Sequence, residues 1–523
     1  MEKNQNDKNN KDDINHMNDK SGNYDKNNIS NFIDKNDEHV MSDILHKINN
    51  KEEKKYEEIK SYSECLELLY KTHALKLGLD NPKKLNESFG HPCDKYKTIH
   101  IAGTNGKGSV CYKIYTCLKI KKYKVGLFSS PHIFSLRERI IVNDEPISEK
   151  ELIHLVNEVL NKAKKLYINP SFFEIITLVA FLHFLNKKVD YAIIETGIGG
   201  RLDATNILTK PEVIVITSIG YDHLNILGDK LPIICNEKIG IFKKDTNVVI
   251  GPSVAIYKNV FDKAKELNCS IHTVVPEPRG ERYNEENSRI ALRALEILNI
   301  NIDYFLKSII PIKPPLRIQY LATEQIQHIK KMFSPDNLEP NVLYPLAVIL
   351  DVGHNETAID RLCTDINYFH KGQNIRVCIS ITKPRNLSVF HPFIAQFGDT
   401  LKDIFYLPSL NERTYDFEEI VEMINNEEEI KNEIKDLILS SSKKIVKWLA
   451  HEKQGNINEE DALKLYKRGC IPLIIKNAFL ECCKDNSILL VCGTFFVFDE
   501  VLNTFDIHSD MQDTIFMNEP SLV

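Results

Sequence analysis

Short apolar runs alternate with longer amphipathic stretches from about residue 60 onward. The runs at 98–103 ("TIHIAG"), 191–197 ("YAIIETG") and 213–220 ("VIVITSIG") are rich in β-branched residues, and the second and third begin with continuous apolar segments. Between such runs lie helical patterns, among them 149–166 and 172–186. Continuous apolar strands separated by helices predict a mostly parallel sheet that is covered on both faces, the α/β class.

A second, smaller α/β pattern follows a proline-rich stretch at 311–315 ("PIKPP"), which predicts a linker. Its apolar runs begin at 346 ("LAVILDVG"), 375 ("IRVCISI"), 403 ("DIFYLPS") and 487 ("SILLVCG"). A capping asparagine predicts a helix from Asn458 to Gly469. We therefore expect two α/β domains, at 56–311 and 312–523.

Three segments lack this pattern. Residues 1–55 are mostly Asn, Lys and Asp and have almost nothing apolar to bury, so we expect a disordered extension. Residues 322–343 and 411–456 are charged, Asn-rich and weakly patterned, so we expect exposed, dispensable insertions.

Composition narrows the protein class. The chain of 523 residues has 42% hydrophobic and 27% charged residues and a net charge of −6, which is typical of a soluble protein and indicates no nucleic-acid partner. The longest apolar run is too short to span a bilayer, and the N-terminus resembles neither a signal nor a transit peptide. Twelve cysteines without a Cys-x-x-Cys pair favour reduced thiols and a cytoplasmic location, with an organellar pool left open.

A glycine-framed lysine follows the first predicted strand, in "GTNGKGS" at 103–109. Glycines free backbone N–H groups to surround a polyphosphate, and Lys107 would add a positive charge. The stretch is shorter than a strict P-loop and has a glycine after the lysine. A glycine-rich turn before a surface helix is the alternative.

Polar residues follow four successive predicted strands. They are the glycine loop, Ser129 to His132, Glu195 to Asp203, and Asp222 with His223. Ligands of open parallel sheets bind at the carboxyl ends of the strands. Hydroxyl, carboxylate and imidazole groups around a polyphosphate suit Mg²⁺, which completes its octahedron with phosphate oxygens and water.

Six motifs together resemble the folylpolyglutamate synthase and dihydrofolate synthase family of the Mur ligase superfamily. They are "GTNGKGS", "SSPHIFSLRERI", "ETGIGGRLDATN", "TSIGYDHLNILG", "NEKIGIF" and "DVGHN", in this order. The resemblance covers roughly 60–520 apart from the insertions. It implies a P-loop-type ATPase domain followed by a smaller Rossmann-like C-terminal α/β domain.

The activity that the resemblance implies is ATP-dependent amide ligation. L-Glutamate would be joined to 7,8-dihydropteroate, and further glutamates to tetrahydrofolate, through an acyl phosphate. One activity alone is the nearest alternative; a nucleotide-binding switch or kinase and a catalytically dead scaffold are two others. The implied cofactors are ATP and Mg²⁺ at two sites, the implied partners are small molecules, and we expect a monomer.

The resemblance also implies roles for individual residues. The nucleotide-binding positions are Asn105, Gly106, Lys107, Gly108, Ser109, Asn287, Arg317 and Asp351. The implied Mg²⁺ ligands are Ser130, Glu195 and His223. Lys107 and His354 would act at the reacting phosphate, and Lys238 would carry a carbamate, with an exposed helix lysine as the alternative.

Folate-side positions follow from the same resemblance. They are Gly78, Leu79, Phe173, Asp203 and Ala204, and core packing is the alternative for Phe173. The sequence departs from the family pattern at Glu356, where proline is usual, and at Leu316, where glycine is usual between Pro315 and Arg317. The turn at Leu316 is therefore expected to differ.

Overall fold

The structure, a computed structural model, describes residues 58–513 apart from 73–76, 278–281, 335–342, 427–431 and 453–465; the side chains of Phe305 and Ile309 are also left out. The expected disordered extension at 1–55 lies outside the described residues, as does most of the helix expected from Asn458. We call residues 58–311 the first lobe and residues 312–513 the second lobe.

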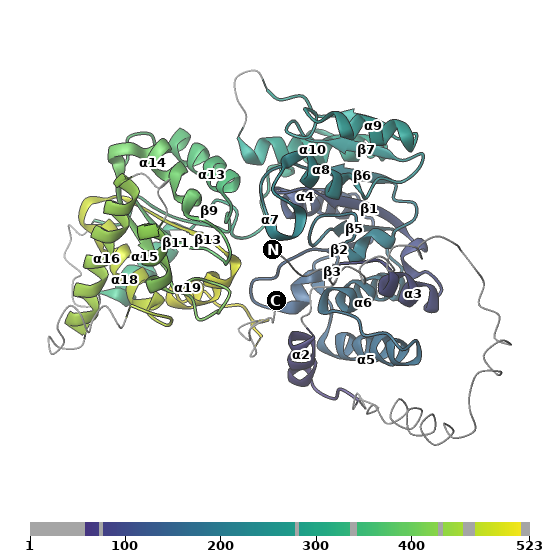
Figure 1. Cartoon of the computed structure of the whole chain (residues 1–523), viewed down its shortest axis with the longest axis horizontal. Helices are drawn as coiled ribbons and strands as arrows, with labels where there is room; N and C mark the ends of the chain where they lie inside the picture. Colours follow the sequence, from purple (N-terminus) through teal and green to yellow (C-terminus); the bar gives the residue numbers. More distant parts are fainter. Residues whose placement is uncertain are drawn as a thin grey trace, which may run out of the picture. The chain divides into compact units, whose positions relative to one another are not determined.

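An eight-stranded sheet forms the centre of the first lobe (Figure 1). Its order is β4-β3-β2-β5-β1-β6-β7-β8, parallel from β2 to β8, with β3 and β4 antiparallel at one edge. The strands are β1 (Lys97–Ala102), β2 (Val125–Phe128), β3 (Ile140–Val142), β4 (Glu145–Pro146), β5 (Tyr191–Glu195), β6 (Val213–Ile216), β7 (Asn247–Ile250) and β8 (Ser270–Thr273).

Helices cover both faces of this sheet. Val213 and Val215 of β6 join an apolar cluster with α4 and α10, whereas Ile214 and Ile216 join a cluster with α8 and α9. Because successive strand residues point to opposite faces, both faces are buried, and the expected α/β class is confirmed. The helices are α2 (Tyr62–Lys71), α3 (Asp80–Ser88), α4 (Lys107–Ile120), α5 (Glu149–Lys165), α6 (Phe172–Lys187), α7 (Leu224–Leu227), α8 (Leu231–Ile239), α9 (Lys258–Glu266), α10 (Tyr283–Ile297) and α11 (Tyr304–Ile309), with 3-10 turns η1 (Pro92–Asp94), η2 (Leu136–Arg139) and η3 (Ala204–Ile207).

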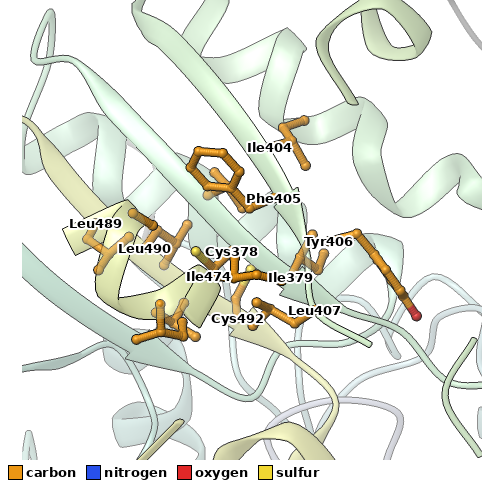
Figure 2. Close-up of a cluster of buried hydrophobic side chains, with 14 of the residues drawn as sticks. Cys378, Ile379, Ile404, Phe405, Tyr406, Leu407, Ile474, Leu489, Leu490 and Cys492 are labelled. Carbon is orange, nitrogen blue, oxygen red and sulfur yellow. The ribbon is translucent and has the colours of Figure 1, made fainter. Parts of the chain in front are cut away.

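The second lobe has a five-stranded sheet in the order β12-β11-β13-β10-β9, parallel except for β9. Its strands are β9 (Gln319–Tyr320), β10 (Ala347–Asp351), β11 (Ile375–Ser380), β12 (Leu401–Tyr406) and β13 (Ile488–Gly493). Figure 2 shows its core, where side chains of β11, β12 and β13 meet Ile474 of helix α18. The helices are α12 (Thr323–Phe333), α13 (Glu356–Phe369), α14 (His391–Phe397), α15 (Phe417–Asn426), α16 (Asn432–Glu452), α18 (Ile471–Asp485) and α19 (Phe498–Thr504), with turns η4 (Leu387–Phe390), η5 (Gly398–Thr400) and η6 (Phe495–Val497). Among the helices that the structure describes, none has the length and apolar content needed to cross a membrane.

The expectation of exposed, dispensable insertions is wrong for the described parts of 322–343 and 411–456. Ile326 and Ile329 of α12 are buried in the core of the second lobe. Helices α15 and α16 also bury isoleucines there, among them Ile434 and Ile445. The charged background hid isoleucines at helical spacing, and those residues decide the packing.

Three helices of the first lobe contain expected site residues. Helix α4 begins at Lys107, and α10, which contains Asn287, begins at Tyr283. Helix α8, which contains Lys238, ends at Ile239. Because α4 begins at Lys107, the glycine loop is also the first turn of a helix, where backbone N–H groups lack partners within the helix.

Candidate functional site

Two glycines of the loop between β1 and α4 have no room for a side chain. Gly103 and Gly106 have φ of +150° and +85°. A Cβ at Gly103 would lie 1.9 Å from Oγ1 of Thr217, and one at Gly106 would lie 2.4 Å from Oδ1 of Asn287. The loop therefore needs glycine at both positions, and the structure places Asn287 against Gly106.

Two lysines contact the same carbonyl of this loop. Lys107 Nζ donates to the Gly103 and Thr104 carbonyls, at 3.1 and 3.2 Å, and Lys238 Nζ donates to the Gly103 carbonyl at 3.0 Å. Burial, followed by the charge of Lys107, lowers the pKa of Lys238 to about 7. Lys238 is thus buried beside the glycine loop, and a large fraction of its amine is neutral at pH 7.

Glu195 ends strand β5 next to the glycine loop. It is buried, and its Oε2 accepts the backbone N–H of Ser130 at 3.1 Å. A Cβ at Gly108 would lie 3.6 Å from the same oxygen. Burial raises the pKa of Glu195, while the charge of Lys107 and the Ser130 amide oppose that rise. The structure thus brings together Ser130, Glu195, Lys107 and Gly108.

Asp222 and His223 follow β6. His223 has φ of +50° and a side chain that is 40% exposed. Asp222 is buried and accepts Nη2 of Arg385 at 2.8 Å and Nδ2 of Asn355 at 3.1 Å. Burial by itself raises the pKa of Asp222, but His223, Arg385 and His354 together lower it below its usual range. Asp222 is therefore a carboxylate that connects the two lobes.

An amide pair makes a second connection between the lobes. Asn105 Nδ2 donates to Oδ1 of Asn355 at 3.1 Å, and Asn355 Nδ2 donates to Oδ1 of Asn105 at 3.0 Å. Oδ1 of Asn355 also accepts the Ala358 N–H at 2.9 Å and so caps helix α13. One side chain of the second lobe therefore contacts the glycine loop and Asp222.

Sequence reasoning missed two residues of this arrangement. Asn355 stands in the "DVGHN" motif, but only its neighbours were assigned roles. Arg385 follows the apolar run of β11, so the strand-end criterion applied to the first lobe could have found it. No local sequence pattern indicates either pairing, because Arg385 and Asp222 are 163 positions apart and Asn355 and Asn105 are 250 positions apart.

Asp351, Arg317 and His354 surround the start of the second lobe. Asp351 ends β10 and accepts the N–H groups of Ile318 at 2.8 Å and Gly353 at 2.6 Å. The guanidinium of Arg317 lies 5.6 Å from the ring centroid of Phe495. His354 Nδ1 lies 2.9 Å from the Val352 carbonyl, and burial lowers the pKa of His354 to about 3. His354 is therefore neutral at pH 7 with its proton on Nδ1.

The expected folate-side residues lie around the loop that follows β5. A Cβ at Gly197 would lie 2.7 Å from the ring of Phe173. Oδ2 of Asp203 accepts two backbone N–H groups of this loop, and Oδ1 accepts two donors from Thr205. Asp203 therefore holds the loop in shape. Ala204 is buried in η3, against which α3 packs. Gly78 N–H donates to the Leu202 carbonyl at 3.2 Å, and Leu79 directly precedes α3.

The donors at this edge of the sheet suit a cation held with few protein ligands. Within the described residues, no group of three or more His, Cys, Asp and Glu side chains is arranged to hold a metal ion. Ser130 and Glu195 are nevertheless adjacent, and His223 lies on the loop after the next strand but one. Proteins commonly bind Mg²⁺ with few ligands of their own, through one or two carboxylates together with phosphate oxygens and water.

A cavity of about 930 Å³ is lined by residues of both lobes. Its lining includes Asn284 and Ser288 of α10 and Ile318, but of the described residues neither Asn287 nor Arg317 lines it. Its other lining residues include Lys313, Tyr320, Asp365 and Phe369. Burial raises the pKa of Asp365 to about 6. The cavity is large enough for a nucleoside.

Comparisons with known proteins agree with this geometry. Residues 101–296 match the Mur ligase middle domain family. A dihydrofolate synthase/folylpolyglutamate synthase of Bacillus subtilis is 34% identical over 335 residues, which are 60% of this chain and 77% of that protein. This chain belongs to the dihydrofolate synthase/folylpolyglutamate synthase family. It is an ATP-dependent ligase, and the resemblance drawn from the six motifs is confirmed.

Other members of the family extend the comparison. A probable dihydrofolate synthetase of Schizosaccharomyces pombe is 28% identical over 62% of this ligase and 81% of its own length. The structure of E. coli FolC in complex with DHPP and ADP has a TM-score of 0.64 at 22% identity, covering 86% of this chain and 99% of that chain. A bifunctional enzyme of Yersinia pestis complexed with AMPPNP and a Mn ion has a TM-score of 0.65 at 21% identity, with the same coverage. At these identities the structures establish the fold.

Proposed function

We propose that this ligase has two activities: it joins L-glutamate to 7,8-dihydropteroate, and it adds further glutamates to tetrahydrofolate. The observation that carries the proposal is the meeting of Lys107, Lys238 and Glu195 at the glycine loop. The similarity to the Bacillus subtilis relative, which is named for both activities, supports two glutamate acceptors rather than one. A single activity remains the alternative.

The glycine loop would hold the triphosphate of ATP. Free N–H groups at the start of α4 and the ammonium of Lys107 both neutralise phosphate oxygens. Lys107 now donates to loop carbonyls, so these hydrogen bonds would be exchanged for bonds to phosphate. The cavity lined by Asn284, Ser288 and Ile318 would hold the nucleoside, and Asn287, Arg317 and Asp351 would contact the nucleotide.

The reaction needs an activated carboxylate. Its oxygen attacks the γ-phosphorus of ATP, ADP leaves, and an acyl phosphate forms. The glutamate amine then attacks the acyl carbon, and phosphate leaves as the amide bond forms. The protein mainly positions the reactants and neutralises charge in such transfers. Neutral His354, whose Nδ1 proton is given to the Val352 carbonyl, can accept a hydrogen bond at Nε2 near the phosphate without adding charge.

Ser130, Glu195 and His223 would hold Mg²⁺. The ion would neutralise charge on the phosphate oxygens as the γ-phosphoryl group is transferred. The fit rests on the buried carboxylate of Glu195, which lies beside Gly108 in the described structure. A relative's complex with Mn and AMPPNP supports the assignment of a divalent metal.

Lys238 has the environment that carbamylation requires. A neutral amine attacks CO₂, and the lowered pKa of Lys238 supplies that form near neutral pH. Carbamylation would replace a cation next to Lys107 with an anion. Protein equilibrated with ¹³C-bicarbonate should show a carbamate carbon signal by NMR that is absent from Lys238→Gln. The same spectrum in both proteins would contradict the assignment.

The experiment that tests the function measures ATP-dependent incorporation of labelled glutamate. Purified enzyme is given dihydropteroate or tetrahydrofolate separately, with Mg²⁺ present or chelated. We expect incorporation with both acceptors and loss of both on chelation. Incorporation with one acceptor would establish the single-activity alternative.

Lys107→Ala is the matched site variant. Removing the only lysine of the glycine loop should lower both rates at least a hundredfold, because an uncompensated phosphate charge costs several kcal/mol. Lys124→Ala removes an exposed lysine of the same lobe and is the control. Near-normal turnover by Lys107→Ala would contradict the phosphate-site assignment.

The proposal includes small-molecule substrates, a monomer and a cytoplasmic location. Each can be checked on the purified or tagged protein, by mass in solution and by cell fractionation. A dimer in solution would overturn only the assignment of a monomer, since every proposed site residue belongs to one chain.

A further inference from the structure

The loop between β2 and β3, residues 129–139, is shaped by two carboxylates that have no part in the proposed chemistry. One is its own Glu138, which accepts the N–H groups of Ile133, Phe134 and Ser135 at 2.8 to 2.9 Å. The loop begins beside the active site, where the Ser130 N–H donates to Glu195. The shape of this loop therefore affects the position of Ser130.

The second carboxylate comes from the last described residue of the chain. Asp513 accepts the Leu136 N–H, the Ser135 hydroxyl and the Tyr62 hydroxyl, each at 2.8 Å. Its own N–H donates to the Phe134 carbonyl at 2.9 Å. The side chain of Asp513 is buried with the residue 4% exposed. Burying a carboxylate is costly unless donors surround it, and three donors do so here.

Apolar contacts bring the same loop against the second lobe. Ile133 and Phe134 pack against the core cluster of that lobe, although they belong to the first lobe in sequence. Asp513 follows helix α19 of the second lobe and bonds to the residues directly after Phe134. The tip of the loop, residues 133–136, is thus held against the second lobe by both apolar packing and buried hydrogen bonds.

The two ends of the loop, which lie toward the active site, are joined by further contacts. The Ser129 N–H donates to the Arg139 carbonyl at 3.1 Å, and Arg139 Nε lies 2.9 Å from Nδ1 of His132. Ser130 lies between these two contacts in sequence. Release of the loop from Asp513 would remove the buried hydrogen bonds at Ser135 and Leu136 and so weaken the hold on Ser130.

We propose that Asp513 is a positioning residue for ligation, acting through the 129–139 loop to keep Ser130 against Glu195. The inference rests on the proposed function of Ser130 and Glu195 at the metal and phosphate site. It adds that the C-terminal segment near Asp513 helps to set the geometry of that site from a distance.

Hydrogen exchange tests the structural half of the proposal without metal, nucleotide or activity. Amides of residue 130 and of 132–136 should exchange at least about tenfold faster in Asp513→Ala than in the parent protein, because charge-assisted hydrogen bonds worth more than 1.4 kcal/mol are lost. Asp510→Asn changes an exposed carboxylate of the same segment and should leave exchange unchanged. Unchanged exchange in Asp513→Ala would overturn the proposal.

The Mg²⁺ dependence of turnover tests the functional half. In Asp513→Ala the Mg²⁺ concentration for half-maximal rate should rise severalfold, and saturating Mg²⁺ should recover part of the lost rate. Asp513→Asn keeps one acceptor oxygen, so its Mg²⁺ concentration for half-maximal rate should lie between those of the parent protein and Asp513→Ala. A purely structural role would lower the amount of folded enzyme without moving the Mg²⁺ midpoint, and that result would overturn the proposal.

The experiments distinguish failure of the proposed function from failure of the positioning role. A parent protein that is inactive with both acceptors would refute the function, whereas an active parent with an unchanged Mg²⁺ midpoint in Asp513→Ala would refute only the positioning role. If Asp513→Ala does not fold, Tyr62→Phe removes one of the three donors. It should shift exchange and the Mg²⁺ midpoint in the same direction by a smaller factor, and no shift in either would overturn the proposal.

Discussion

Leu316 has a left-handed backbone, with φ of +55°, although its side chain is buried in the core of the second lobe. The left-handed conformation costs a branched residue about 1 to 2 kcal/mol. Burial of leucine contributes about 1.5 to 3 kcal/mol, so burial outweighs the strain. Leucine at the position where the family usually has glycine thus adopts a left-handed backbone and fills a core position.

Two substitutions separate strain from burial at Leu316. Leu316→Ala removes the packing and keeps the strain, so unfolding free energy should fall by about 2 to 4 kcal/mol. Leu316→Gly removes both and should be about 1 kcal/mol more stable than the alanine variant. Urea denaturation measures the difference, and an alanine variant as stable as the glycine variant would show that the turn is unstrained.

Lys238 predicts a pH dependence of stability. Its pKa is about 7 in the folded protein and near 10.4 in an unfolded chain. Between these values the unfolded state binds more protons, so stability rises as pH increases from 7 toward 10. Lys238→Met should flatten this rise in CO₂-free buffer. Parallel curves of unfolding free energy against pH for the two proteins would mean that Lys238 is as easily protonated in the fold as in water.

At the scale of elements, helix α16 is a structural part of the second lobe. Its Ser441 hydroxyl accepts the Ile404 N–H of β12, and both Ser441 and Lys444 donate to Asp403. Asp403 is buried and also accepts Nε of Arg376 at 3.0 Å. A charged helix that looks dispensable therefore satisfies a buried carboxylate of a core strand.

Truncation of one α16 isoleucine should be costly. Ile445→Ala leaves a cavity in the core cluster and should lower unfolding free energy by about 2 to 4 kcal/mol. Lys447→Ala, on the exposed side of the same helix, should change it by less than about 0.5 kcal/mol. Equal effects of both substitutions in chemical denaturation would restore the view of an inessential insertion.

The sequence predicts local features of this fold better than distant pairings. Parallel strands were predictable because each is a continuous apolar run, and Glu195 was predictable as a polar residue at a strand end. Helix α16 was missed because its isoleucines lie among charges. The pairings of Arg385 with Asp222 and of Asp513 with Ser135 depend on the folded path of the chain, which no local pattern encodes.

At the scale of the whole molecule, polar contacts between the lobes include those at the glycine loop, an ion pair between two helices, and the hydrogen bonds of Asp513 to the 129–139 loop. Asn355 contacts Asn105 and Asp222, and Arg385 contacts Asp222. Arg361 of α13 also pairs with Glu286 of α10 at 2.7 Å. The contacts at the glycine loop join Asn105, a proposed nucleotide-binding residue, to the residue that caps helix α13. We therefore expect them to matter more for turnover than for folding.

Asn355→Ser separates these two effects. Serine caps a helix about as well as asparagine, so α13 should keep its stability to within about 1 kcal/mol. Its short side chain cannot reach both Asn105 and Asp222, so kcat/KM for ATP should fall about ten- to a hundredfold, as expected for lost hydrogen bonds that include a charged partner.

Asn355→Asp provides the opposite test of the same contact. Aspartate also caps α13 but places a second carboxylate against Asp222, so like-charge repulsion should lower turnover further than serine does. Steady-state kinetics and urea denaturation of the two variants give the answer together. If both variants turn over normally while folding normally, the contact at Asn355 is passive, and the lobes must be aligned for catalysis by Arg385 and the linker instead.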